Sequence, residues 1–573
     1  MNNNQNIFFT FLVIIFLGFN LNNVIAQEVS EDEEITVVAP YQPKVSDAFK
    51  INISPRIPEE KLVKPKFDYS IVSKELKTTP ELDPITAARI QGESVSKLYK
   101  NYIKAGFGNY ITPYLEFYAN NLHSKKSAFG VYVKHISSSG KIKDYAYPGN
   151  SHTRASVNAK RIWKKHNLTT NIFYDRKGVH FYGFKPAEFP EFEYEKKDIS
   201  QHYQTVGFNS AFESNYSGEK NLNHKLALDY DYLFDKEGTS EHNIKLFAGL
   251  NKNFEFFSFS EHEKLGLDLD LDYYIFGDKI SPTQNSGIIG IRPYYNMGFD
   301  QYNFRVGFKT AIAMNDSTRV HVYPTVHLEV KVVQDYLVTY AGLNGDLKKN
   351  SLHSLSLENP FIAQNIDKHF TNHKFSQYGG IKGRISKYLD YNLSFTNSTV
   401  DDMALFVNDT SSVMAPGLDN QFVVLYDYGR QSRIIAEFGF HYQEKFNATL
   451  KGQYNNYFLD TQVKPWHKPA FEFALLADHN IQNKIFIKAE LFTRGKIYAR
   501  TFEEQTSGWI TTEVETVTEI KGMADLNLGF EYRYTKVLSG FLNFNNILGQ
   551  RYYKWYNYPS YKFNMMLGVT YSF

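Results

Sequence analysis

The sequence predicts an all-β protein: a transmembrane, antiparallel, up-and-down β-barrel of about 22 strands (between about 20 and 24) behind an extended N-terminal periplasmic tail. Three observations predict it. Apolar and polar residues alternate with a period of two from residue 99 to residue 573. Short polar turns alternate with long connections, and the last strand ends on an aromatic residue.

The N-terminus, residues 1–26, has the pattern of a secretory signal peptide. An apolar core from Ile7 to Phe19 is followed by the small-residue cleavage site Val24-Ile25-Ala26, before Gln27. No Lys or Arg precedes the core, which departs from the usual signal. A buried core helix is the alternative, but the cleavage site directly after the apolar core favours a signal peptide.

Residues 27–98 differ in character from the rest of the chain. They are rich in Glu, Asp, Lys and Pro and poor in aromatic residues. Proline interrupts both helices and strand ladders, so this spacing predicts an extended periplasmic segment. The prolines stand at positions 40, 43, 55, 58, 65, 80 and 84.

From residue 99 to residue 573 the period of two predicts the barrel. Alternate residues of a strand point to opposite faces, so a strand with one apolar and one polar face suits a wall between lipid and a wet lumen. Helical spacing does not explain the pattern. In the clearest strand, Leu265, Leu267, Leu269 and Leu271 alternate with Gly266, Asp268, Asp270 and Asp272.

The connections between the predicted strands alternate in length, as they do in outer-membrane barrels, whose short turns face the periplasm. We interpret 403–428 as part of a loop. The short turns are at 164–167, 217–221, 444–447, 481–483 and 535–537. The long connections are at about 137–151, 178–200, 346–373, 399–431, 459–469, 497–520 and 548–560.

The last strand carries the pattern expected of a barrel-assembly signal. Counting back from the end, Phe573, Tyr571, Val569 and Leu567 form an apolar face, and the residues between them are small or polar. We therefore identify Phe573 and Tyr571 as the C-terminal signal. Both chain ends of the barrel, like the N-terminal tail, are expected on the periplasmic side.

Composition narrows the function classes. The aromatic fraction is 16% although the mean hydropathy is only −0.42, which suits a surface that is half lipid-facing and half wet. The absence of cysteine excludes disulfides, thiolate metal sites and a lipid-anchored N-terminal Cys. A net charge of +2, with dispersed basic residues, does not indicate a nucleic-acid partner.

Candidate functional residues are few. Asp268, Asp270 and Asp272 share one strand face, and we interpret them as an acidic stripe on the lumen wall. A calcium site is the alternative, because carboxylate oxygens suit hard cations. His369 and His373 lack a third ligand at a convincing spacing. No catalytic or phosphate-binding motif occurs, so we expect no enzyme, no cofactor and no metal.

Two features resemble the TonB-dependent receptors of Gram-negative outer membranes. The segment Glu34-Ile35-Thr36-Val37-Val38-Ala39-Pro40 looks like a TonB box, which would pair as an added strand with TonB. A tail segment that happens to be β-branched is the alternative. The predicted barrel also resembles theirs in size, in loop asymmetry and in its aromatic C-terminal strand.

The resemblance fails for the plug, the folded domain that fills such barrels. Only about seventy Pro-interrupted residues precede the first strand, too few for an ordinary plug. We therefore expect inward-folded loops, with the tail or a partner, to fill the lumen. A structural or accessory subunit of an outer-membrane complex (secretion, uptake or barrel assembly), with outer-membrane lipid and protein partners, is the favoured function. A TonB-dependent or porin-like transporter is the alternative.

Overall fold

The computed structural model describes residues 99–121, 124–216, 221–278, 283–315, 317–364, 366–410, 418–507 and 510–573, with the backbone alone for 504–507 and 510–513. The predicted signal peptide, the tail and the TonB-box-like segment lie outside the described residues.

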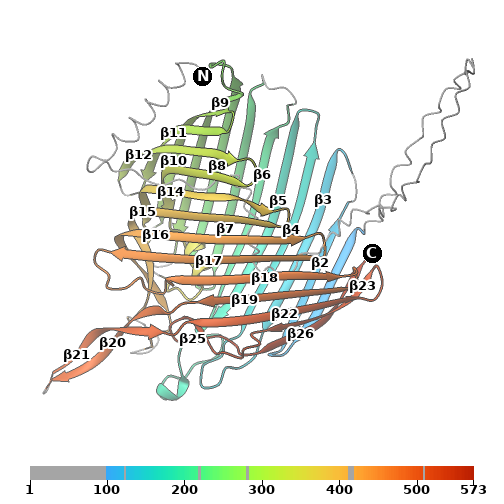
Figure 1. Cartoon of the computed structure of the whole chain (residues 1–573). Coiled ribbons are helices and arrows are strands. Elements are labelled where there is room, and N and C mark those ends of the chain that lie inside the picture. Colours follow the sequence, from blue (N-terminus) through green and yellow to red (C-terminus); the bar gives the residue numbers. More distant parts are fainter. Residues whose placement is uncertain are drawn as a thin grey trace, which may run out of the picture.

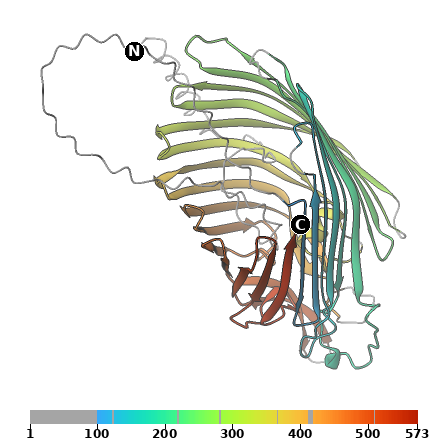
Figure 2. The same ribbon diagram turned by 90° about the vertical axis from the view of Figure 1, so that its right-hand side faces the viewer.

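The described chain forms a closed antiparallel barrel of 22 strands, as the sequence predicts. Each strand pairs with its neighbours in chain order, and β1 pairs with β26 to close the sheet. Figures 1 and 2 show the two curved walls that the first and second halves of the chain contribute.

The first eleven barrel strands are β1 (Asn101–Gly108), β2 (Thr112–Asn120), β3 (Ser127–Ser138), β4 (Asn150–Ile162), β5 (His166–His180), β6 (Ser200–Ser214), β7 (Asn223–Asp235), β8 (Ser240–Phe254), β9 (His262–Gly277), β10 (Gln284–Phe299) and β11 (Tyr302–Met314).

The other eleven are β12 (Thr318–Val333), β13 (Leu337–Lys349), β14 (Phe370–Ser386), β15 (Leu389–Asn408), β16 (Phe422–Tyr442), β17 (Phe446–Leu459), β18 (Phe471–Ile481), β19 (Ile485–Arg494), β22 (Met523–Arg533), β23 (Leu538–Asn545) and β26 (Asn564–Ser572).

The long connections contain the remaining elements, which are η1 (Pro186–Glu188), α2 (Leu352–Glu358), and the hairpins β20 (Ile497–Ser507) with β21 (Ile510–Ile520) and β24 (Tyr553–Trp555) with β25 (Tyr558–Pro559). The hairpin of β20 and β21 projects from the end of the barrel that carries the long connections (Figure 1). No helix in the described ranges has the length and apolarity that a helical membrane span requires.

Strand faces follow the predicted alternation. On β9, Leu265 and Leu269 are exposed on the outer surface, whereas Tyr274 and Phe276, which have the opposite parity, pack into an interior cluster. An exposed leucine row on the outside of a closed barrel is the surface that hydrocarbon would cover.

The seam between β1 and β26 is packed from the inside by an aromatic ring. Gly106 pairs directly with Gly568 across the seam, and Phe541 of β23 pairs with Gly568. A Cβ atom at either glycine would lie within 3 Å of the Phe541 ring, so only glycine leaves room for it. The ammonium nitrogen of Lys104 lies 4.3 Å from the centre of that ring. The ring therefore covers the place where the two ends of the sheet meet.

Candidate ligand-binding site beneath the loop cap

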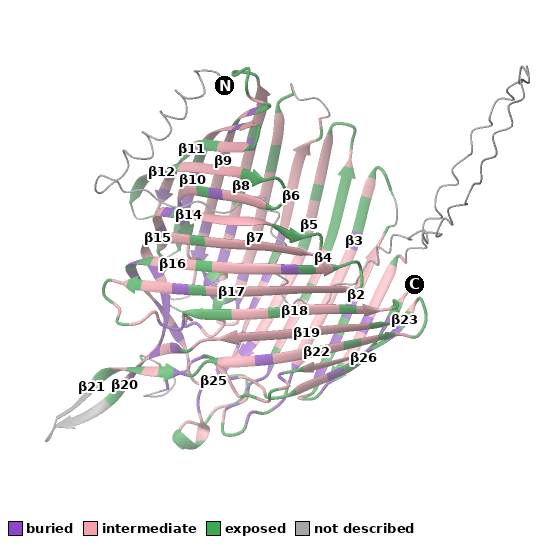
Figure 3. Cartoon of the chain, in the orientation of Figure 1, coloured by how far each residue is buried: buried purple, intermediate pink, exposed green. Residues whose placement is uncertain are grey.

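The long connections fold together over one mouth of the barrel. We call this assembly the loop cap and define it as the described residues 181–199, 350–364, 366–369, 403–410, 418–427, 460–470 and 546–563. Its main apolar cluster joins cap side chains to three aromatic residues and one leucine of the inner wall. Figure 3 shows the buried residues gathered behind the ends of β15 and β16 that enter the cap. The cluster includes Leu352, Leu355, Ile362, Phe406, Phe422, Val424, Trp555 and Tyr558 from the cap and Tyr203, Leu233, Tyr274 and Phe276 from the wall.

The interpretation of 403–428 as a loop is wrong at both of its ends, 403–408 and 422–428. β15 continues to Asn408 and β16 starts at Phe422, and the two strands pair to their ends. The pairing shifts between Val400 and Met403, where Asp402 has a φ of 53°. Beyond this irregularity both faces of the hairpin are buried. A strand that is apolar on both faces loses the alternation by which a half-exposed strand is recognised.

Charged groups of the barrel wall hold α2 inside the lumen. The buried carboxylate of Glu241 accepts a hydrogen bond from the backbone N–H of Leu352 at 2.7 Å. Asp231 pairs with Nδ1 of His353 at 2.9 Å. Lys349, just before the helix, donates to Asn243 at 2.8 Å and pairs with Asp272 at 2.6 Å. The helix is thus attached to β7, β8 and β9 through polar contacts.

His467 joins two other cap segments through hydrogen bonds of its two ring nitrogens. Nδ1 of His467 lies 2.9 Å from the carbonyl oxygen of Phe406, and Nε2 accepts from the backbone N–H of Tyr556 at 3.3 Å. This pattern requires a neutral ring with its proton on Nδ1. Burial lowers the pKa of His467 to about 4, and Arg494 and Lys468 act in the same direction.

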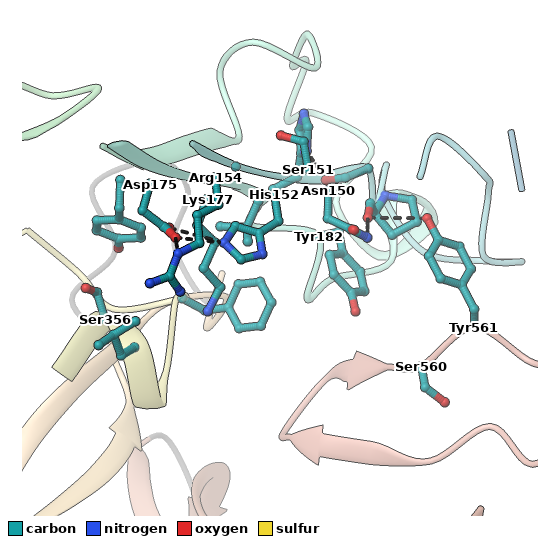
Figure 4. A pocket seen from close by; sticks show the side chains of 18 of the residues that line it. Asn150, Ser151, His152, Arg154, Asp175, Lys177, Tyr182, Ser356, Ser560 and Tyr561 are labelled. Atoms are coloured by element: carbon teal, nitrogen blue, oxygen red, sulfur yellow. Dashed lines mark hydrogen bonds and ion pairs between the residues drawn. The ribbon is translucent and has the colours of Figure 1, made fainter. Parts of the chain in front are cut away.

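A cavity of about 920 Å³ lies in the lumen, between the loop cap and the wall of β4 to β6. Figure 4 shows Arg154, Asp175 and Lys177 from the wall converging on the side of the cavity that faces Ser356 of α2. Tyr182, Tyr561 and Ser560 approach from the loops. The volume is in the range of pockets that hold drug-sized organic molecules.

The wall of this cavity carries one shared carboxylate. Asp175 pairs with Nε2 of His152 at 3.1 Å and lies 4.0 Å from Nε of Arg154. Leu357 of α2, which is 63% exposed, and Phe361 supply an apolar side. The arrangement offers cationic groups beside an apolar surface, which suits recognition of an organic molecule.

The residues that the sequence singled out lie elsewhere. Asp270 lies 3.6 Å from Arg292 of β10, and Asp272 pairs with Lys349. Among the described residues, no three His, Asp or Glu side chains are grouped closely enough to hold a metal ion. His369 stacks on Tyr426 with ring centres 4.3 Å apart and lies 3.4 Å from Asp402.

At the C-terminus, Tyr571 and Phe573 are exposed on the outer face, with ring centres 5.5 Å apart. Phe573 and Asn101 exchange backbone hydrogen bonds of 3.0 and 2.9 Å. The last residue of the chain therefore takes part in closing the barrel.

Sequence reasoning missed the cavity residues. His152, Arg154, Asp175 and Lys177 all share the polar parity of β4 and β5, and nothing in the sequence separates them from other lumen-facing residues. The available signal was the position of each at the end of a strand next to a long connection.

Sequence comparisons identify no relative: no protein-family model and no curated protein matches the chain. Solved structures, in contrast, match the chain. The siderophore receptor PirA from Acinetobacter baumannii matches with a TM-score of 0.61 at 10% identity, over 82% of this chain and 80% of that one. The pyoverdine outer membrane receptor FpvA from Pseudomonas aeruginosa, bound to pyoverdine, matches with a TM-score of 0.61 at 13% identity, over 83% and 78%.

A third match is the ferric-catecholate import receptor Fiu from E. coli, with a TM-score of 0.58 at 9% identity, over 83% of this chain and 82% of that one. At such identities the likeness concerns the fold. The 22-stranded barrel of this chain has the fold of the barrels of TonB-dependent siderophore receptors.

Proposed function

We propose that the chain is an outer-membrane transporter of the TonB-dependent receptor type, and that the solute it moves binds first in the cavity beneath the loop cap. The observation that carries this proposal is the capped cavity of about 920 Å³ inside a barrel of receptor size. A barrel that served only as an anchor would not need a roomy, partly cationic chamber behind folded loops.

The comparisons support transport over the accessory-subunit function that the sequence favoured. The matched structures are described as siderophore and import receptors, and their barrels match this one over most of both chains. In this proposal the N-terminal tail and the C-terminus face the periplasm, and residues 34–40 pair with TonB as an added strand.

Uptake by whole cells tests the proposal. Cells that express the full chain, or a variant that lacks residues 34–40, are incubated with a mixed metabolite extract, and solute depletion is followed by mass spectrometry. We expect the full chain to deplete at least one solute, and we expect a protonophore or the deletion to abolish depletion at an equal amount of folded barrel.

The opposite result has a defined meaning. If depletion is the same with and without the deletion, and the deletion instead removes proteins that co-purify with the barrel, the chain is an accessory subunit with a periplasmic docking tail. Co-purification in mild detergent from the same cells provides this second measurement.

A further inference from the structure

We propose that the cavity beneath the loop cap takes an anionic solute, and that the ammonium group of Lys177 is its main charged contact. This inference rests on the proposed function, because it assigns the cavity to the transported solute. It adds the chemical class of that solute, which follows from how the charges of the cavity wall are paired.

The register of β4 and β5 determines this pairing. His152 stands directly opposite Lys177, and Arg154 stands directly opposite Asp175. Asp175 pairs with His152 at 3.1 Å and lies 4.0 Å from Arg154, so one carboxylate serves two basic side chains. Among the described residues, Lys177 makes no hydrogen bond and no ion pair.

The wider surroundings of Lys177 do not offset its charge fully. Asp175 attracts the ammonium group, but Lys554 of the cap repels it. Three positively charged residues line the cavity, Arg154, Lys177 and Lys562, and two negatively charged residues line it, Asp175 and Asp525. The Asp525 carboxylate accepts a hydrogen bond from the hydroxyl of Tyr552 at 2.8 Å, so one of its two oxygens already has a partner.

Lys177 is held half-buried at this cavity. Removing an ammonium group from water is costly unless an opposite charge or acceptors replace the lost hydration. A carboxylate or another oxyanion would supply both, through a charge-assisted hydrogen bond. The register makes Arg154 and Lys177 diagonal neighbours on β4 and β5, and Figure 4 shows both on one side of the cavity. An organic anion bound on that side would meet both side chains.

The apolar side of the cavity restricts the ligand further. Leu357 of α2 and Phe361 also line it. An organic anion that combines acidic groups with an apolar or aromatic body fits this division. On the charged wall a cationic solute would meet Arg154 and Lys177, and the carboxylate there, Asp175, already serves two basic side chains, so the geometry disfavours that class.

Binding to the purified full chain tests the inference. The chain has no cysteine, so Leu357→Cys allows one environment-sensitive dye to be attached at the cavity wall. The probes are benzene-1,3,5-tricarboxylate and the neutral benzene-1,3,5-tricarboxamide, which share a ring and differ in charge. We expect the tricarboxylate to bind at least roughly tenfold more tightly than the triamide, since a charged hydrogen bond contributes more than a neutral one.

Three variants identify the contact. Lys177→Gln should weaken tricarboxylate binding roughly tenfold, and Lys177→Arg should retain most of it. Arg176→Gln is the matched control, because it removes the same charge from the neighbouring position on the opposite face of β5. It should change the affinity less than about twofold. Heat-modifiable migration on gels verifies that each variant is folded.

The outcomes separate this inference from the proposed function. Equal or tighter binding of the triamide, or an unchanged affinity in folded Lys177→Gln, overturns the anionic class while leaving the cavity as a solute site. If neither probe changes the dye signal in the full chain, the cavity is not a binding site, and the proposed function fails with the inference.

Discussion

The barrel wall and the loop cap are held together in different ways. In the wall, each strand is hydrogen-bonded to two neighbours over a long regular register, and one face of each strand is exposed. The cap has few regular pairings, and aromatic rings together with single buried polar groups such as Glu241 and His467 hold it. We therefore expect the cap to open as a separate unit while the wall stays folded.

The largest expected effect comes from making the same substitution in both regions. Phe422→Ala in the cap and Phe541→Ala at the seam each remove a buried ring, at a cost of about 3–5 kcal/mol. For Phe422→Ala we expect protease cleavage within the cap and higher conductance in planar bilayers, with unchanged migration of the unheated barrel on gels. For Phe541→Ala we expect loss of the heat-modifiable form at a lower temperature.

If the two variants gave the same pattern in both assays, cap and wall would unfold as one unit, and the comparison would fail. Phe544→Ala, a half-buried ring on the same strand as Phe541, provides a smaller reference change within the wall.

A second pair of variants tests which side chains of the wall face lipid and which face the lumen. Leu269→Arg should cost roughly 2–4 kcal/mol if the side chain lies near the bilayer midplane. Asp270→Asn, one residue away on the face that meets Arg292, should cost about 1 kcal/mol, because asparagine keeps the shape of the side chain and the 3.6 Å contact with Arg292 is longer than a hydrogen bond. Urea titration of the barrel refolded into lipid vesicles measures both. Similar values would mean that the two faces are assigned incorrectly.

The cap should loosen in acid through His467. Its pKa is about 4 in the folded cap against an ordinary value of 6.5, so the open cap binds the proton more tightly. The stabilisation is complete above pH 6.5 and is lost as the pH falls towards 4, and at pH 5 the loss is about 2 kcal/mol. Hydrogen exchange of cap amides between pH 8 and pH 5, corrected for the intrinsic rate, measures it.

His467→Gln is the control for this prediction, because glutamine does not titrate in this range. Its cap should be less stable at pH 8 and should lack the loss of protection between pH 6.5 and pH 5. A wild-type cap whose corrected protection is flat across the range would contradict the assigned pKa.

The last prediction concerns the polar attachment of α2. Glu241→Gln keeps the side-chain shape but replaces a charged acceptor for the Leu352 N–H with a neutral one, which should cost about 1–2 kcal/mol. We expect faster exchange of the α2 amides, with the cluster around Trp555 unchanged. Equal loosening of both would show that the polar and apolar parts of the cap are not independent.

These differences explain how much the sequence could predict. Leu269 and Asp270 reveal their faces directly, because lipid and lumen impose opposite polarity on alternate positions. The same rule predicted the closed barrel and its strand number. It also placed the long connections at one end, where the structure has the cap.

Alternating polarity did not predict the cap or its cavity. Phe406 and Phe422 lie in a hairpin that is buried on both faces, so their strands carry no alternation. Lys177 has the same parity as every other lumen-facing residue of β5, and its lack of a carboxylate partner depends on the register with β4. The burial of the hairpin and the pairing of Lys177 both depend on contacts between segments far apart in the sequence, and no local sequence pattern encodes such contacts.

The seam between β1 and β26 has a consequence for biogenesis. The two strands that close the barrel are the two barrel strands that lie farthest apart along the chain, and β26 follows all the others in chain order. Until β26 is paired, β1 and β23 each present an unpaired edge that invites association with other chains. A chain that ended before Asn564 would leave the edge of β1 unpaired, so we expect such a sheet to associate with other chains rather than to close as a smaller pore.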